Sequence, residues 1–244
     1  MSIRAGGSEL SRVISAGAMP RVVVAGETLW APYSITVPTN PIYGSETPPF
    51  LGSLTSSTIS IPATDKQAGD LILAFCSTDG NKVLSPSAGW TTLGALTGDP
   101  TCYVFARYWS GTSTINLTVS WSGSEDFAYA TLHLRDATRE LSEIQLFGPI
   151  STGSGSPVDV PTFTPSRADE YMWVAAIGMS SGYITAAPEG WGGASGASGT
   201  SAANAGVGYV MKKERASSMG VTGVELSGSA SWRAAMMAVP PRKS

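Results

Sequence analysis

The chain has 244 residues, of which 42% are hydrophobic and only 14% are charged, and its formal net charge is −3. This length accommodates one large domain or two smaller ones, and the weakly acidic balance lacks the basic footprint of a nucleic-acid-binding protein. The apolar runs fall far short of the roughly 20 residues that span a bilayer, and the first residues lack the pattern of a secretory signal. We therefore expect no nucleic-acid partner and no membrane partner.

The first 54 residues differ in character from the rest of the chain. A valine run, Val22, Val23 and Val24, is followed by a glycine turn and then by Leu29 and Trp30, a pattern typical of short hairpins. A proline-rich tract with five prolines follows between residues 32 and 49 and favours extended backbone. Small hairpins need a surface to pack on. We predict that residues 1–54 form an attachment arm, with these five apolar residues as its docking side chains.

The remainder of the chain contains an internal repeat. Five phrases recur in the same order: 59–62 with 158–161, 69–74 with 169–174, 86–90 with 188–191, 103–109 with 208–214, and 119–132 with 224–237. In the second pair Leu71 is aligned with Tyr171, and in the last pair Ser-Gly-Ser is identical. The sequence therefore predicts two tandem copies of one domain, 55–147 and 158–244, joined by a flexible linker at 148–157.

Each copy has the pattern of an all-β domain. Short stretches rich in β-branched and aromatic residues alternate with glycine, serine and proline turns, and helical periodicity never extends beyond two turns. This pattern predicts two antiparallel β-sandwiches after an N-terminal hairpin arm. The spacing is compatible with either a jelly-roll or an immunoglobulin-like topology. The linker composition indicates separate bodies on a short tether.

A Pro-x-x-Gly-Trp phrase at 86–90 returns in shortened form at 188–191. The structural interpretation, which we favour, is a turn in which glycine adopts an unusual conformation and tryptophan caps the sandwich. In the functional interpretation, exposed Trp90 and Trp191, together with Trp109, would stack on a sugar ring.

Few side chains have the character of a chemical site. The single histidine, His133, lies in an alternating strand, so we expect a structural role. Glu125 and Asp126 form the only tight acidic pair, and the second copy has Ala230 and Ser231 there; a depolymerase is the least favoured function. Asp79 precedes Gly-Asn, which indicates a hairpin turn more than a calcium loop. We predict no catalytic residues, no metal and no cofactor.

Two cysteines, Cys76 and Cys102, lie on different predicted strands. A single pair in a chain without a secretory signal is not a disulfide scaffold. We expect two buried, reduced thiols, although the sequence leaves a disulfide open.

The order of motifs resembles a β-sandwich module of structural proteins in tailed bacteriophages and prophages. The resemblance is carried by Gly69-Asp70 before an apolar run, the Pro-x-x-Gly-Trp-Thr phrase ending at Thr91, the strand from Val104 to Tyr108 and the closing Ser-Gly-Ser strand. It implies a non-enzymatic virion structural protein, made in the host cytoplasm, that docks on head, portal or tail proteins as a homo-oligomer. The alternative is a host-attachment protein that binds surface glycans.

Overall fold

The structure is a computed structural model that describes residues 55–63, 66–111, 114–166, 169–196 and 205–242, together with the backbone of six short strands between residues 4 and 46. The fold is all-β, as the sequence predicted. Its one described helical element is the single 3₁₀ turn η1 (Leu141–Glu143). Within the described residues, no helix is long and apolar enough to cross a bilayer.

The first repeat unit consists of two antiparallel sheets. Its strands are β6 (Tyr43–Glu46), β7 (Ser56–Ile61), β8 (Leu71–Thr78), β9 (Ser85–Pro86), β10 (Thr91–Leu96), β11 (Thr101–Tyr108), β12 (Ile115–Ser120) and β13 (Phe127–Leu134). They form a five-stranded sheet in the order β10-β11-β8-β13-β6 and a three-stranded sheet in the order β7-β12-β9. The core between these sheets is rich in aromatic residues, including Phe105 and Phe127.

The second unit repeats this arrangement strand for strand. Its strands are β14 (Ser151–Ser154), β15 (Val158–Phe163), β16 (Asp169–Met179), β17 (Ile184–Ala186), β18 (Gly192–Gly196), β19 (Gly206–Ala216), β20 (Met219–Leu226) and β21 (Ser231–Val239). The sheet orders are β14-β21-β16-β19-β18 and β15-β20-β17, the same as in the first unit when corresponding strands are matched. The internal repeat in the sequence is therefore a repeat of the fold.

The strand pairing resolves the open topology as a jelly roll. Within each unit the first strand pairs with the eighth, the second with the seventh and the third with the sixth, all antiparallel. This pairing follows from rolling up one long hairpin, which defines the jelly roll. The immunoglobulin alternative needs the first two strands of a unit in one sheet, and here they lie in different sheets.

One sequence alignment of the two units is wrong by one residue. Leu71 pairs with Leu134, and the equivalent of Leu134 on β21 is Val239, which pairs with Met172. Leu71 therefore corresponds to Met172 and not to Tyr171. A slip of one residue reverses the face of every side chain in a strand, and Tyr171 indeed faces the core within its own unit while Leu71 faces the other unit.

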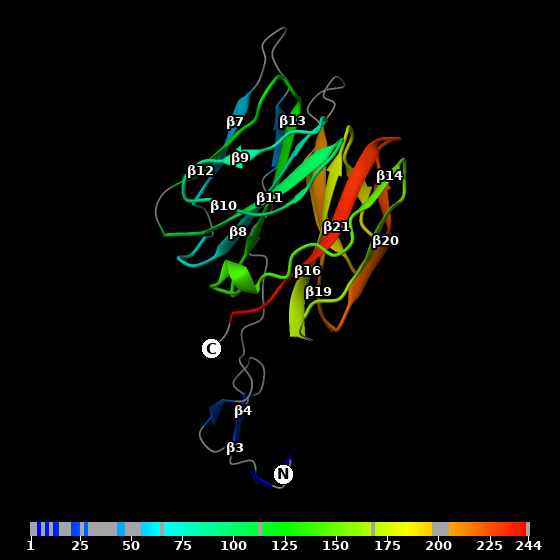
Figure 1. The fold of residues 1–244 in the computed structure, drawn as a ribbon. Helices are drawn as coiled ribbons and strands as arrows, with labels where there is room; N and C mark the ends of the chain where they lie inside the picture. The colour runs from blue at the N-terminus through cyan, green and yellow to red at the C-terminus, as the bar shows by residue number, and fades with distance from the viewer. Residues whose placement is uncertain are drawn as a thin grey trace.

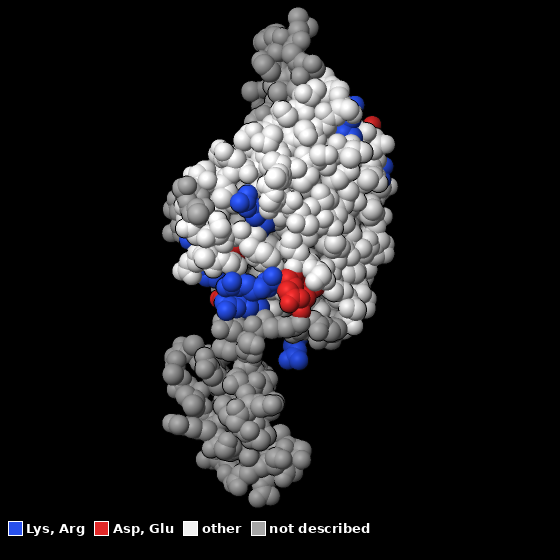
Figure 2. Space-filling model, turned by 60° about the vertical axis from the view of Figure 1, so that its left-hand side comes forward, with Lys and Arg blue, Asp and Glu red and all other residues white. Residues whose placement is uncertain are grey.

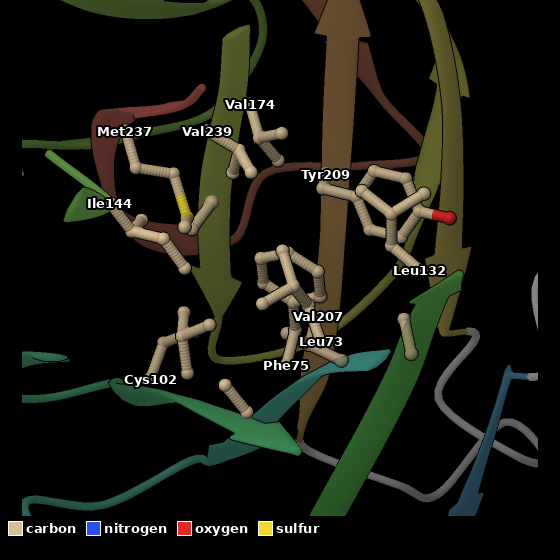
Figure 3. Packing of buried hydrophobic residues seen from close by; sticks show 14 of the residues in the cluster. Leu73, Phe75, Cys102, Leu132, Ile144, Val174, Val207, Tyr209, Met237 and Val239 are labelled. Carbon is tan, nitrogen blue, oxygen red and sulfur yellow. The ribbon is translucent and has the colours of Figure 1, made fainter. Parts of the chain in front are cut away.

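The two units form one body because their five-stranded sheets pack face to face. A single apolar cluster joins residues of β8, β11 and β13 with residues of β16, β19 and β21 (Figures 1 and 3). At its centre the Phe75 and Tyr209 rings stack with centroids 4.9 Å apart, and the Tyr209 hydroxyl donates to the Thr131 carbonyl at 3.1 Å. The expectation of separate bodies on a tether is thus wrong. Both five-stranded sheets are buried on both faces, which explains their nearly continuous apolar runs.

The interface between the units has approximate two-fold symmetry. β11 contacts β16 while β19 contacts β8, and β10 contacts β21 while β13 contacts β18. The ends of β8 and β16, the central strands of the two five-stranded sheets, lie close together. A Cβ on Gly178 of β16 would stand 3.3 Å from Ser77 Oγ of β8 and 2.6 Å from Cys102 Cβ. The pseudo-axis therefore runs along the strands. We call the end where β8 and β16 begin the base, and the end where they finish the tip.

Two predicted segment boundaries need correction. The expected linker 148–157 contains β14, which pairs with β21 as an edge strand of the second unit. The expected arm contains β6, which pairs with β13 as an edge strand of the first. Both segments look like linkers because small and polar residues dominate them, but an edge strand needs backbone pairing more than apolar side chains.

Strand pairs also occur within the first 28 residues. β1 (Arg4–Ala5) pairs with β2 (Ser8–Glu9), and β3 (Arg12–Ile14), β4 (Arg21–Val24) and β5 (Glu27–Thr28) form a small meander. Short hairpins were expected there. β6 begins toward the base, because it runs antiparallel to β13 with Tyr43 opposite Ala130 and Glu46 opposite Phe127. β6 therefore runs in the direction from the base to the tip.

Candidate functional site

Comparison of the two units identifies polar side chains that the fold itself does not require. Asp70, His133 and Arg135 of the first unit correspond to Tyr171, Ala238 and Pro240 of the second, by the strand pairing described above. Asp79 and Glu125 correspond in the same way to Ser180 and Ala230. The first unit thus carries a polar cluster at each end where the second unit has small or apolar side chains. These two clusters are the candidate sites.

The base cluster is centred on the Asp70 carboxylate. His133 Nε2 donates to Asp70 Oδ2 at 2.6 Å, Arg135 Nη2 donates to the same oxygen at 3.2 Å, and the Gln67 N–H donates to it at 2.9 Å. Asp70 and His133 are each 4% exposed. Their position follows from the topology, because the start of β8 lies beside the ends of β11 and β13.

The surroundings of this cluster determine its protonation. Burial alone would raise the pKa of the Asp70 carboxyl, but the hydrogen bonds from Gln67, Arg135 and His133 outweigh it and leave the pKa below its ordinary value. Burial lowers the pKa of His133 despite the attraction of Asp70. A histidine this deeply buried cannot reach an external substrate, so the cluster is a buried polar network that fixes the base of the sheet.

Further cations lie around this network. The Arg139 guanidinium occupies the space that a Cβ on Gly69 would need, and the φ of +88° at Gly69 is a conformation that other residues rarely adopt. Lys66 Nζ lies 5.6 Å from the centroid of the Trp109 ring, a cation–π distance. Figure 2 shows Lys and Arg side chains beside Asp and Glu side chains at this end of the body, while most of the face in view is uncharged. The base is therefore the more strongly charged end of the surface in that view.

The tip cluster joins two loops of the first unit. Lys82, after β8, forms a salt bridge with Glu125, before β13, at 2.8 Å between Nζ and Oε1. Burial, the interaction with the neighbouring Glu125 carboxyl group and the nearby charge of Asp126 raise the pKa of Asp79 to about 7. Burial alone would raise the pKa of Glu125, but its hydrogen bonds with Asp79 and Lys82 lower it. Burial and the neighbouring carboxylates therefore favour the protonated form of Asp79.

This geometry bears on the chemistry considered for the acidic residues. The acidic pair that the sequence singled out, Glu125 and Asp126, lies in this cluster, where Glu125 is engaged by Lys82. Among the described residues, no group of three or more His, Cys, Asp or Glu side chains is arranged to hold a metal ion. The tip cluster links the loop after β8 to the loop before β13 through the Lys82–Glu125 salt bridge.

We expect Asp79→Asn to change the pH dependence of stability. The folded-state pKa of about 7 lies above the ordinary value of 3.8, so the folded state holds an extra proton between these values and wild-type stability falls as pH rises through this window. An asparagine amide at this position does not titrate. The free energy of unfolding of the variant minus that of wild type should rise from pH 4 to about pH 7 and then level off.

Urea denaturation at a series of pH values measures this difference. Glu189→Gln, at an exposed carboxylate of the second unit, is the matched control and should show no such trend. A difference for Asp79→Asn that does not vary with pH would contradict the raised pKa of Asp79.

The predicted sugar-stacking tryptophans are not exposed platforms. Trp90 is 7% and Trp109 is 2% exposed, and the Trp90 indole donates to the Asn116 carbonyl at 3.1 Å. Trp191 is partly buried against the core of its unit. Trp90 and Trp191 each end a turn. Gly89 and Gly190, the residues just before them, have φ of +86° and +78°, and a backbone hydrogen bond closes each turn. Both phrases are thus turns that end in a capping tryptophan, as the structural interpretation held.

The cysteines are both free and fully buried. Cys76 faces the core of the first unit, whereas Cys102 faces the interface between the units. Side chains on opposite faces of one sheet cannot form a disulfide. The expectation of two reduced thiols is confirmed, and burial raises the pKa of Cys102 to about 12, which makes this thiol unreactive.

The structure does not describe the side chains of the predicted docking residues. Val22, Val23 and Val24 form the end of β4, whose backbone alone is described. Leu29 and Trp30 lie outside the described residues. Their role as docking side chains stays a prediction.

The sequence did not predict that these polar residues form clusters. Asp70, His133, Asp79 and Glu125 were each visible, but partners 63 residues apart, as Asp70 and His133 are, meet only through strand pairing. The position of each acid at an end of the same apolar run was the available signal. Comparison with protein-family models, with curated proteins and with solved structures finds no match.

Proposed function

We propose that this chain is a non-enzymatic structural protein of a tailed-phage virion, docked by its N-terminal arm and projecting its two jelly rolls as one rigid body. The observation that carries the proposal is the polarity of the body. β6 runs in the direction from the base to the tip. The last described residues lie at the base, since Arg242 N–H donates to the Asp136 carbonyl and Thr138 N–H to the Pro240 carbonyl. The tip loops point the opposite way (Figure 1).

The packing supports a scaffold role. The dry interface between the five-stranded sheets makes the two units one body, so a partner that holds the base also fixes the direction of the tips. Edge strands on both five-stranded sheets offer backbone groups to neighbouring copies, consistent with a homo-oligomer on the virion. The motif resemblance to phage sandwich modules points the same way.

Cryo-EM of intact particles, with mass spectrometry of their proteins, tests the proposal. We expect the four-layer body in symmetric positions with the base toward a head, portal or tail protein. A chain lacking residues 2–42 should keep its urea midpoint, because β6 remains, and should be lost from particles. Particles devoid of the chain, or full incorporation of the truncated chain, would contradict the proposal.

The alternative is a host-attachment protein that stacks surface glycans on aromatic side chains. With Trp90 and Trp109 buried, it depends on Trp191 alone among the three predicted platforms. Bodies at a distal tail tip, together with loss of adsorption in Trp191→Ala particles, would favour this alternative over a purely structural role.

A further inference from the structure

An open cleft lies on the second unit, where β14, β15 and β20 meet. Its volume is about 470 Å³, within the range of small-molecule sites. Six of the residues that line it are Ser151, Asp159, Pro161, Thr162, Gly220 and Thr222. None of them belongs to the base or tip cluster, and the cleft is separate from the three tryptophans considered above.

The cleft coincides with a local departure of the second unit from the first. In the first unit β7 and β12 pair in continuous register. In the second unit the corresponding pair, β15 and β20, shifts register twice, between Val158 and Val160 and again between Val160 and Phe163. The fold is the same in both units and therefore does not require these irregularities. Bulges of this kind are enriched beside binding sites because they redirect side chains.

The outward-facing polar side chains also differ between these two sheets. In the first unit they are paired across the strands, Thr58 with Thr118 at 2.9 Å and Ser60 with Asn116 at 3.2 Å. In the second unit no hydrogen bond joins the side chain of Thr162 or Thr222 to another described residue. The bulged sheet thus leaves the Thr162 and Thr222 hydroxyls available, whereas the regular sheet pairs its corresponding polar side chains across the strands.

One carboxylate is fixed at the cleft. Asp159 Oδ1 accepts from the Gly223 N–H at 2.9 Å, and Ser151 Oγ donates to the Asp159 carbonyl at 2.9 Å, which holds the backbone of the bulge. The side chains of Val160 and Val221 belong to the core behind the cleft, so only their backbone borders it. The lining therefore combines one carboxylate, the Thr162 and Thr222 hydroxyls and the Pro161 ring, without any Lys, Arg or His.

We propose that this cleft binds a neutral saccharide. A fixed carboxylate accepts hydrogen bonds from adjacent sugar hydroxyls, the threonine hydroxyls donate and accept, and the Pro161 ring contacts the C–H face of a pyranose ring. Anionic ligands are disfavoured because the lining has a negative charge and no cation. The inference does not depend on the proposed virion role.

Chemical-shift mapping on the full-length ¹⁵N-labelled protein tests it, with maltose, lactose and chitobiose at millimolar concentrations as probes. At least one probe should shift amides of β15 and β20 and leave β7 and β12 unchanged. Asp159→Asn keeps an oxygen for the Gly223 N–H but loses the charge, so affinity should fall about tenfold. Thr222→Val, which removes one hydroxyl, should also weaken binding.

The matched control is Thr58→Val with Thr118→Val on the equivalent sheet of the first unit, which should bind as wild type does. Unchanged spectra away from the cleft show that each variant is folded. Absence of shifts with all three sugars would overturn the proposal, as would shifts that persist unchanged in both cleft variants. If N-acetyl-lysine amide shifts these amides and the sugars do not, the cleft takes a cation instead.

Discussion

Tyr209→Ala should lower the free energy of unfolding of the whole chain by about 4 kcal/mol. Removing a large buried ring costs about 3–5 kcal/mol, because apolar contact is lost and a cavity remains. Here the Tyr209 ring also stacks on Phe75, and its hydroxyl group donates to the Thr131 carbonyl. Both partners belong to the first unit. The loss therefore falls on the interface that joins the two units (Figure 3).

Urea denaturation followed by tryptophan fluorescence and by circular dichroism measures the effect. Wild type should unfold in one transition, because neither unit can expose its interface face without losing the shared core. Tyr183→Ala is the matched control: that tyrosine is 45% exposed, and its loss should cost less than about 0.5 kcal/mol. A Tyr209→Ala protein within 1 kcal/mol of wild type would mean that the interface contributes little.

Asp70→Ala should be nearly as damaging, with a loss of about 3 kcal/mol. Breaking a buried ion pair by removing one partner costs about 3–5 kcal/mol, and the lower figure applies because Arg135 is partly exposed. Without the carboxylate, His133 is left buried beside the Arg135 cation. The second unit shows the apolar solution at the same positions, with Tyr171 and Ala238.

A double variant makes this experiment specific. Asp70→Ala combined with His133→Ala removes the stranded imidazole together with its partner, so the double variant should be less destabilised than the sum of the two single variants. Additive effects would show that the two side chains do not act as a pair.

The pH dependence of the same variants provides a second test. Because the folded-state pKa of His133 lies below its ordinary value of 6.5, its contribution to stability is present above pH 6.5 and is lost as pH falls toward the lowered value. His133→Ala should therefore lose less stability than wild type on acidification below pH 6.5. An equal acid response of the two proteins would contradict the burial of a neutral His133.

The sequence by itself determined the all-β class, the duplication and the capping turns. These are local properties: alternation and β-branched residues define strands, proline and glycine define the turns before Trp90 and Trp191, and two copies of one pattern must form two copies of one fold. The buried state of both cysteines could also be predicted, because each lies within an apolar run.

The tertiary structure alone decided the rest. Apolar residues on both faces of β8 and β16 show that each strand is covered twice. Which sheet covers the second face depends on contacts between residues far more than 100 positions apart, such as Phe75 with Tyr209. The register of Leu71 against Met172 was misread for the same reason, since two runs that are apolar on both faces contain no alternation to fix it. Strands β6 and β14 have few apolar side chains and are held by backbone pairing, so composition describes them as linkers. The base, the tip and the cleft on β15 and β20 exist only once these strands are paired.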